Sequence, residues 1–168
     1  TVIGQLEPVC KEVHLFVFSA GEENKNLDTV RDLYEFLIQN HYDRNDMLVA
    51  LGGGVVGDLC GFTAATYLRG IRFIQVPTTL LSQVDSSIGG KTGVDFDAYK
   101  NMVGAFHMPQ LVYTAASSLL TLTEEQFACG MGEVIKHGLI MDADYYEWLQ
   151  VHWKEILARD LSVCEQMI

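Results

Sequence analysis

The most chemically suggestive part of the sequence is a polar block at residues 77–107, rich in glycine and small hydroxyl side chains. It carries two lysines, Lys91 and Lys100, the amide Asn101, and an acidic residue, Asp85, before the first lysine. Such a segment makes a poor scaffold, but its cations, amide and flexible glycines suit a ligand cradle. The block therefore predicts a binding site for a small molecule that carries negative charge.

A P-loop is one alternative for this block, because the run from Gly89 to Thr92 resembles the end of that motif. The G-x-x-x-x-G-K-[ST] frame needs its first glycine at residue 85, where this chain has aspartate. A P-loop nucleoside triphosphatase is therefore disfavoured.

A second candidate site is the glycine turn Gly52-Gly53-Gly54-Val55-Val56-Gly57-Asp58, which follows a predicted strand and opens a predicted helix. Backbone without side chains can approach a pyrophosphate, and the start of a helix offers free N–H groups. The dinucleotide fingerprint also expects an acid about 20 residues further on, and residues 74–77 contain none. Either this is a variant dinucleotide fold, or the glycines only serve a tight turn.

Two shorter patterns carry charged side chains that could also bind a ligand. After the first predicted strand, Glu22 could accept hydrogen bonds from ribose hydroxyls and Lys25 could contact phosphate, although a solvated turn explains them as well. Further on, Glu133, Lys136 and His137 share one helix face. The first and last could hold a divalent ion, or the face could simply be exposed to solvent.

Hydrophobic periodicity predicts the elements that must position these residues. Strands are predicted at 13–18, 47–51, 72–76 and 111–113, and helices at 27–41, 55–67, 124–140 and 142–157. Strands that alternate with helices indicate an α/β fold with a partial Rossmann-like parallel sheet. The pattern is helical from residue 123 onward, which predicts an α/β domain at 1–114 and the start of an all-α domain at 115–168.

Composition narrows the classes of partner. The 168 residues include 22 acids and 11 bases, a net charge of −11 that disfavours nucleic acid. No apolar run is long enough to predict a membrane span, and no signal peptide is visible. Four widely spaced cysteines among apolar residues favour reduced thiols, and hence a cytoplasmic protein.

Four motifs together resemble the 3-dehydroquinate synthase family of sugar-phosphate cyclases. They read GGGVVGDLCGFTAATYLRG at 52–70, PTTLLSQVDSSIGGKTGV at 77–94, KNMVGAF at 100–106 and GEVIKHG at 132–138. The similarity extends over nearly the whole chain, and the second motif is the most specific. Both ends of the family pattern are missing, including two zinc-binding histidines expected beyond Ile168.

The resemblance implies NAD as cofactor, a sugar phosphate as substrate, a divalent metal (zinc, with cobalt as the alternative) and a homodimer. NAD contacts would fall on Glu22, Lys25, Gly53, Gly54, Asp58, Thr78, Thr79, Lys91, Lys100, Leu119 and Thr121. Substrate-binding positions would be Asp85, Lys91, Asn101 and Lys136, with Arg69 reaching the substrate phosphate of the neighbouring subunit. Glu133 would be one zinc ligand.

The implied reaction converts 3-deoxy-D-arabino-heptulosonate 7-phosphate to 3-dehydroquinate and phosphate in aromatic amino-acid biosynthesis. Three residues depart from the expected pattern: Asp95 stands in place of Asn, Thr123 in place of Pro and His137 in place of Tyr, so His137 is not assigned as a metal ligand. A related sugar-phosphate cyclase, a glycerol-dehydrogenase-like oxidoreductase and a non-catalytic fragment are the competing hypotheses. With a single predicted zinc ligand, the chain is expected to be inactive alone.

Overall fold

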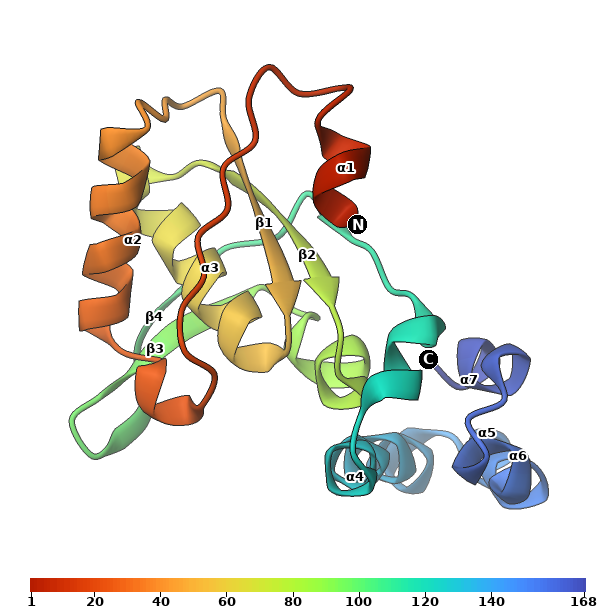
Figure 1. Cartoon of the computed structure of the whole chain (residues 1–168). Coiled ribbons are helices and arrows are strands. Elements are labelled where there is room, and N and C mark those ends of the chain that lie inside the picture. Colours follow the sequence, from red (N-terminus) through yellow and green to blue (C-terminus); the bar gives the residue numbers. More distant parts are fainter.

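The computed structural model describes residues 1–168, and a small parallel sheet lies at its centre (Figure 1). The sheet has the order β1-β2-β5, formed by Met47–Gly52, Arg72–Pro77 and Leu111–Val112. Both pairs of neighbours are parallel. The predicted α/β fold and three of its four predicted strands are confirmed.

The predicted strand at 13–18 is wrong, because this segment is extended but pairs with no strand. Its apolar side chains alternate as expected: Phe16 and Phe18 pack on the core, while Leu15 and Val17 are exposed. The ring of Phe16 lies 5.3 Å from that of Phe36, on a neighbouring helix. The alternation of buried and exposed side chains therefore arises because the segment packs against a helix, and not because it pairs within the sheet.

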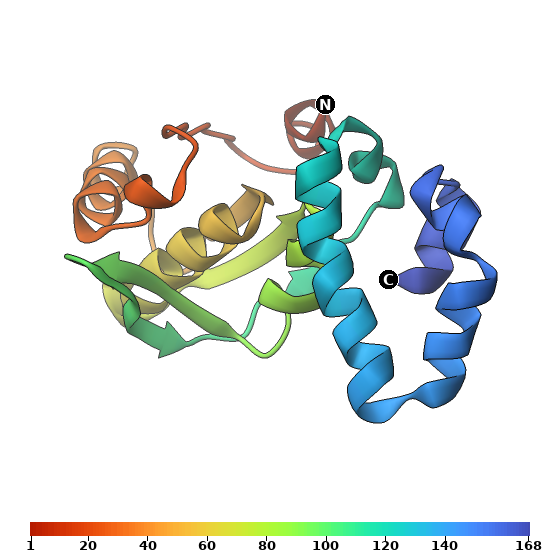
Figure 2. The same cartoon turned by 90° about the horizontal axis from the view of Figure 1, so that it is seen from below.

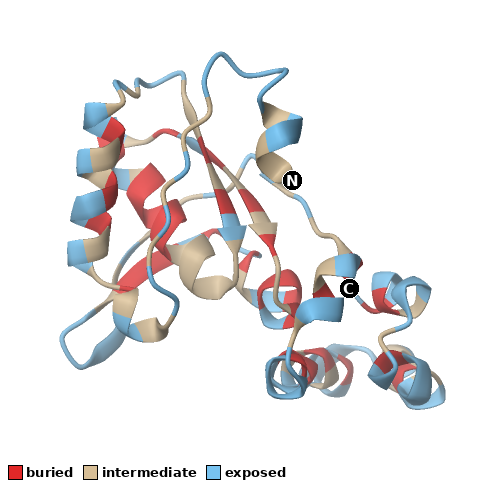
Figure 3. Ribbon diagram, viewed as in Figure 1, coloured by how far each residue is buried: buried red, intermediate tan, exposed pale blue.

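Two helices build the first layer around the sheet (Figures 1 and 3). Helix α2, Leu27–Gln39, begins at Asn26, whose side chain accepts from the N–H of Thr29. Helix α3, Gly54–Thr66, follows the glycine turn and packs against both the sheet and a β-hairpin. Its Gly61 allows this close approach, because a Cβ there would lie 2.4 Å from Thr92 Cγ2.

The hairpin is a feature that the sequence analysis missed. It consists of β3, Lys91–Phe96, and β4, Tyr99–Phe106, which pair antiparallel as a separate sheet. Both strands lie within the polar block at 77–107, whose glycines and charged residues are poor strand formers. The block is thus half loop and half hairpin.

The remaining elements are helices. The short ones are α1 (Val2–Leu6), η1 (Glu22–Asn24), η2 (Tyr67–Arg69), η3 (Ser82–Ser86, a π-helix) and η4 (Ala116–Thr121). The others are α4 (Glu124–Met141), α5 (Ala143–Val151), α6 (Trp153–Leu157) and α7 (Leu161–Met167). The single helix predicted at 142–157 is broken at His152, whose Nδ1 lies 2.9 Å from the carbonyl of Trp148.

Two separate hydrophobic clusters hold these elements together. The first joins α2, α3, the sheet and the hairpin, around Phe73, Leu59 and Leu37. The second joins η3, η4 and α4–α7, which gather beside the sheet in both views (Figures 1 and 2). Leu80 and Val84 of the polar block belong to this second cluster. None of the helices is both long and apolar enough to span a membrane.

Candidate functional site

The glycine turn joins the end of β1 to the start of α3. Gly53 is the N-cap of α3 and no side chain caps the helix there, so backbone N–H groups of the first turn remain available. A Cβ at Gly53 would lie 3.2 Å from Thr79 Cγ2, and one at Gly54 would lie 3.0 Å from Ser86 Oγ. The turn therefore has little room for side chains and leaves its backbone open to a ligand.

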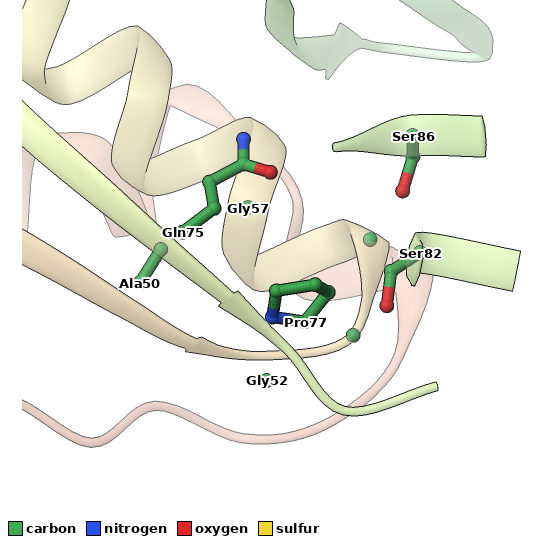
Figure 4. Close-up of a pocket in the computed structure, with 9 residues that line it drawn as sticks. Ala50, Gly52, Gly57, Gln75, Pro77, Ser82 and Ser86 are labelled. Carbon is green, nitrogen blue, oxygen red and sulfur yellow. The ribbon is translucent and has the colours of Figure 1, made fainter. Parts of the chain in front are cut away.

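A small cavity of about 10 Å³ lies over this turn (Figure 4). Besides the glycines, Gln75, Pro77, Ser82 and Ser86 line it, and none of these four was predicted. Gln75 is buried near the end of β2, in the region where the dinucleotide fingerprint expects an acid. A Cβ at Gly57 would meet its amide group at 3.5 Å. The spacing of Ser82 and Ser86, four residues apart in a helix, is the one signal that could have identified them.

A much larger cavity, of about 540 Å³, lies between α3, η3 and the hairpin. Predicted site residues from four elements meet here, namely Asp58 of α3, Asp85 of η3, Lys91 of β3 and Asn101 of β4. The hairpin supplies much of the remaining wall. The volume is within the range of small-molecule sites. The cavity thus unites residues that the sequence analysis selected for both cofactor and substrate.

Lys25 lies at one side of this cavity and is almost fully buried, with 4% of its surface exposed. Its Nζ is 2.7 Å from Asp58 Oδ2 and donates to Asn101 Oδ1 at 2.6 Å. Glu22 lies 3.9 Å from the same ammonium and 3.6 Å from that of Lys100. The structure therefore brings together five of the predicted residues in one polar cluster.

The pKa of Asp58 is raised, chiefly because burial disfavours its charged form. The hydrogen bond and positive charge of Lys25 oppose this rise, while the charges of Glu22 and Asp85 add to it. Lys25 therefore favours the ionised form of Asp58. Removing the lysine would leave a carboxylate in a mostly buried position without its cation.

Helix α4 carries the predicted metal ligand and a substrate lysine. Glu133 and Lys136 form an ion pair one turn apart, and the pKa of Lys136 is raised, first by its hydrogen bond to Glu133. Asp85 adds a smaller electrostatic contribution to the same shift, because η3 packs against α4. Close packing occurs at Gly130, where a Cβ would lie 2.5 Å from Leu80 Cβ.

Glu133 alone does not make a metal centre. Its Oε2 is buried with no hydrogen-bond partner other than the nearby ammonium of Lys136. No group of three or more His, Cys, Asp and Glu residues is placed so that it could hold a metal ion. Structural and catalytic zinc sites take at least three protein ligands, so the residues present do not fit a complete zinc site.

Four other predicted residues lie outside these cavities. The N–H of Thr78 donates to the carbonyl of Gly52 at 2.8 Å, which places it beside the glycine turn. In η4, the side chain of Leu119 is buried in the second cluster, and the hydroxyl of Thr121 donates to the carbonyl of Ser118. Arg69 lies beyond the opposite end of α3, about 20 Å from the glycine turn by helix length.

One arginine that the sequence analysis did not single out stabilises the η4 turn. Arg159 Nη1 donates to the carbonyls of Leu119 at 3.2 Å and Leu122 at 2.7 Å. Its guanidinium also lies over the ring of Phe127, 5.1 Å from the centroid. The last turn of η4 is thus fixed by a residue that follows α6, and sequence spacing gives no signal for such a long-range contact.

Comparison with known proteins identifies the family to which the chain is similar. The family described as 3-dehydroquinate synthase N-terminal matches residues 15–129. The chain belongs to this family. A 3-dehydroquinate synthase of Acetivibrio thermocellus is 54% identical over 154 residues, which cover 92% of this chain and 43% of the relative. One of Nitrosomonas europaea is 49% identical over 160 residues, 93% of this chain and 43% of the relative. The chain therefore spans less than half the length of these relatives.

Solved structures of sugar-phosphate cyclases share the fold. The 2-epi-5-epi-valiolone synthase of Streptomyces hygroscopicus, with NAD⁺ and Zn²⁺ bound, gives a TM-score of 0.89 at 29% identity, over 99% of this chain and 48% of its own. A 2-deoxy-scyllo-inosose synthase complexed with carbaglucose-6-phosphate, NAD⁺ and Co²⁺ gives 0.75 at 31% identity, over 90% of this chain and 46% of its own. These likenesses confirm the Rossmann-like character of the α/β part.

Proposed function

We propose that this chain forms the NAD-binding part and one wall of the substrate site of a 3-dehydroquinate synthase. The reaction would convert 3-deoxy-D-arabino-heptulosonate 7-phosphate to 3-dehydroquinate and phosphate. The observation that carries the proposal is the meeting of Asp58, Asp85, Lys91 and Asn101 around one cavity of about 540 Å³, next to an uncapped helix start at a glycine turn. Relatives at 49% and 54% identity support the same assignment.

The glycine turn fits the pyrophosphate of NAD. Gly53 and Gly54 leave the backbone of the turn without side chains, and the free N–H groups at the start of α3 favour an anion. NAD would take up a hydride from the carbon atom that bears a substrate hydroxyl, and would later return it. Thr79, which lies against Gly53, would border the bound cofactor, and the Lys25–Asp58 pair would lie further along α3.

The lysines would bind the anionic groups of the substrate. Lys91 lines the large cavity and is exposed, while Lys136 reaches toward it from α4, within electrostatic range of Asp85. Each supplies a compact point charge suited to carboxylate or phosphate. Asn101 would orient the substrate through its amide, from the hairpin side of the cavity.

This chain alone supplies neither a complete metal site nor the second subunit of a dimer. Glu133 offers one carboxylate where a catalytic zinc site takes three protein ligands, so we propose that the chain alone has no cyclase activity. We also propose that Arg69, remote from the glycine turn, serves the site of a second subunit in a homodimer. The four free cysteines support a reducing, cytoplasmic environment.

A related sugar-phosphate cyclase is the second candidate, because the two solved structures described above belong to that wider group. Their identities of 29% and 31% fall well below the 54% of the Acetivibrio thermocellus relative. This difference favours the dehydroquinate assignment. Turnover of the heptulosonate phosphate, and not of a hexose phosphate, by an intact enzyme containing this sequence would decide between them.

Two experiments test the proposal. Calorimetric titration of the chain with NAD should show binding at a single site, and absence of binding would contradict the cofactor assignment. In an intact enzyme that contains this sequence, Lys91→Ala and Lys136→Ala should each lower kcat/KM more than tenfold, about 1.4 kcal/mol or more of transition-state binding. Unchanged kinetics in both variants would remove the lysines from the substrate site.

A further inference from the structure

The hairpin pairing is irregular at one residue, Asp95. Val94 pairs with Val103 and Phe96 pairs with Tyr99, so Asp95 alone faces residues 100–102 of β4. Irregularities of this kind bend a strand and redirect side chains, and they are frequent next to active sites. Here the extra residues of β4 include Asn101, which lines the large cavity.

A closed ring of three hydrogen bonds occupies this irregular position. The N–H of Asp95 donates to the carbonyl of Lys25 at 2.8 Å. The ammonium of Lys25 donates to Asn101 Oδ1 at 2.6 Å. The N–H of Asn101 donates to Asp95 Oδ1 at 2.8 Å. Each member therefore fixes the next, although 76 residues of chain separate Lys25 from Asn101.

The ring of hydrogen bonds also holds the backbone of Asn101 in its conformation. That residue has φ of +57°, a left-handed conformation that asparagine tolerates better than most residues. The carboxylate of Asp95 anchors the N–H of this turn, and Asn101 Oδ1 accepts from Lys25. Lys25 in turn is held against Asp58 of α3, which connects the hairpin to the helix that starts at the glycine turn.

We propose that Asp95 is a positioning residue, which holds Lys25 in place for NAD bound along α3 and holds Asn101 in place at the large cavity. It does not itself line the cavity, and it acts through these two side chains. This inference rests on the proposed NAD-binding function.

The decisive comparison is between two substitutions at residue 95. Asp95→Ala removes the acceptor, whereas Asp95→Asn removes the charge but keeps an Oδ1 that can accept from the N–H of Asn101. Asp97→Asn is the matched control, because Asp97 is an exposed residue of the same hairpin and loses the same charge. Amide hydrogen exchange at Leu59, a fully buried residue of α3, reports whether each variant keeps its core.

Two measurements on the 168-residue chain test the inference. Asp95→Ala should speed exchange of the Asn101 N–H at least tenfold and weaken NAD binding at least tenfold by calorimetry, with exchange at Leu59 unchanged. Asp95→Asn and Asp97→Asn should stay within about threefold of the original chain in both. Original affinity in Asp95→Ala, or equal loss in Asp95→Asn, would overturn the positioning role.

The two measurements also separate this inference from the function on which it rests. If the original chain binds no NAD, the proposed cofactor function fails, and the exchange rate of the Asn101 N–H still decides whether Asp95 holds the turn. Unchanged exchange in Asp95→Ala would then refute the ring itself. Faster exchange confined to that variant would support it.

Discussion

Helix α4 contains two glycines, Gly130 and Gly132, that should respond in opposite ways to the same substitution. A Cβ at Gly130 would lie 2.5 Å from Leu80 Cβ and 2.7 Å from the backbone nitrogen of Leu81. A Cβ at Gly132 would meet nothing within 4 Å. Since both glycines lie inside one helix, alanine gains the same helix propensity at each. The difference between the variants therefore isolates the contact with Leu80 and Leu81, which directly precede η3.

The magnitude follows from two opposing contributions. Alanine is better than glycine in a helix interior by about 0.8–1.0 kcal/mol, so Gly132→Ala should raise the free energy of unfolding by about that amount. Gly130→Ala gains the same propensity, but overpacking costs typically about 1–3 kcal/mol. Because the obstacle includes backbone at Leu81, rotation of a side chain cannot relieve it. We therefore expect Gly130→Ala to be less stable than Gly132→Ala by about 1–3 kcal/mol.

Urea unfolding followed by circular dichroism measures both variants against the original chain. The slope of the transition should stay constant, so that a shift in midpoint reports stability alone. Gly130→Ala should also change the environment of Lys136, whose ammonium proximity to Asp85 depends on the packing of α4 against η3. Equal stability of the two variants would refute the reasoning, because it would show that α4 does not pack closely on Leu80 and Leu81 at Gly130.

Three further predictions follow from single contacts. Gly54→Val should weaken NAD binding while the chain stays folded, because the new side chain would fill the space beside Ser86; unchanged calorimetric affinity would make the turn merely structural. Arg159→Ala should lower the free energy of unfolding by about 1–3 kcal/mol, because it leaves carbonyls of the η4 turn without their charged donor, and an unchanged urea midpoint would contradict this. Burial raises the pKa of Cys60 from 9.0 to about 12, so above pH 9 the unfolded state loses this proton first and stability falls by up to about 1.4 kcal/mol per pH unit. Cys60→Ala should show a shallower decline over that range, and identical pH profiles would rule the thiol out as its cause.

Much of the architecture can be predicted from periodicity. The helices at 27–41 and 55–67 and the strands at 47–51 and 72–76 match α2, α3, β1 and β2 within a few residues. The break at His152 was missed, because a polar ring that bonds to the preceding turn leaves the apolar pattern intact. Patterns in sequence record which face is buried more reliably than they record where the backbone turns.

The hairpin was missed because its glycines have another role. At Gly93 and Gly104 the two strands approach so closely that a Cβ would lie 2.7 Å from the carbonyl oxygen of Val103 and 2.3 Å from that of Thr92. In the sequence, such glycines are indistinguishable from those of a ligand-binding loop. The strand at 13–18 was assigned in error for the converse reason, since Phe16 gains its burial from α2 without any pairing.

In the candidate site, too, some residues could be predicted from the sequence and others could not. The residue types of the glycine turn and the polar block selected the groups that now line one cavity. The ring through Asp95 and the contact of Arg159 with η4 could not be selected, because they join segments far apart in the chain. Local spacing identifies side chains suited to bind a ligand, whereas the groups that hold them in place emerge only from the tertiary fold.

The place of η3 in the second hydrophobic cluster bears on how the chain acquires its structure. Leu80 and Val84 precede the hairpin in sequence, yet they pack with Phe127, Met131 and the helices that follow. The hydrophobic core of the helical part is therefore incomplete until Leu80 and Val84, which come from the α/β part, pack into it. Synthesis from the N-terminus would leave these two side chains uncovered until α4 emerges, and a chain cut near residue 115 would leave them so permanently. Folding of the two parts should thus be cooperative, with η3 as the element that both must share.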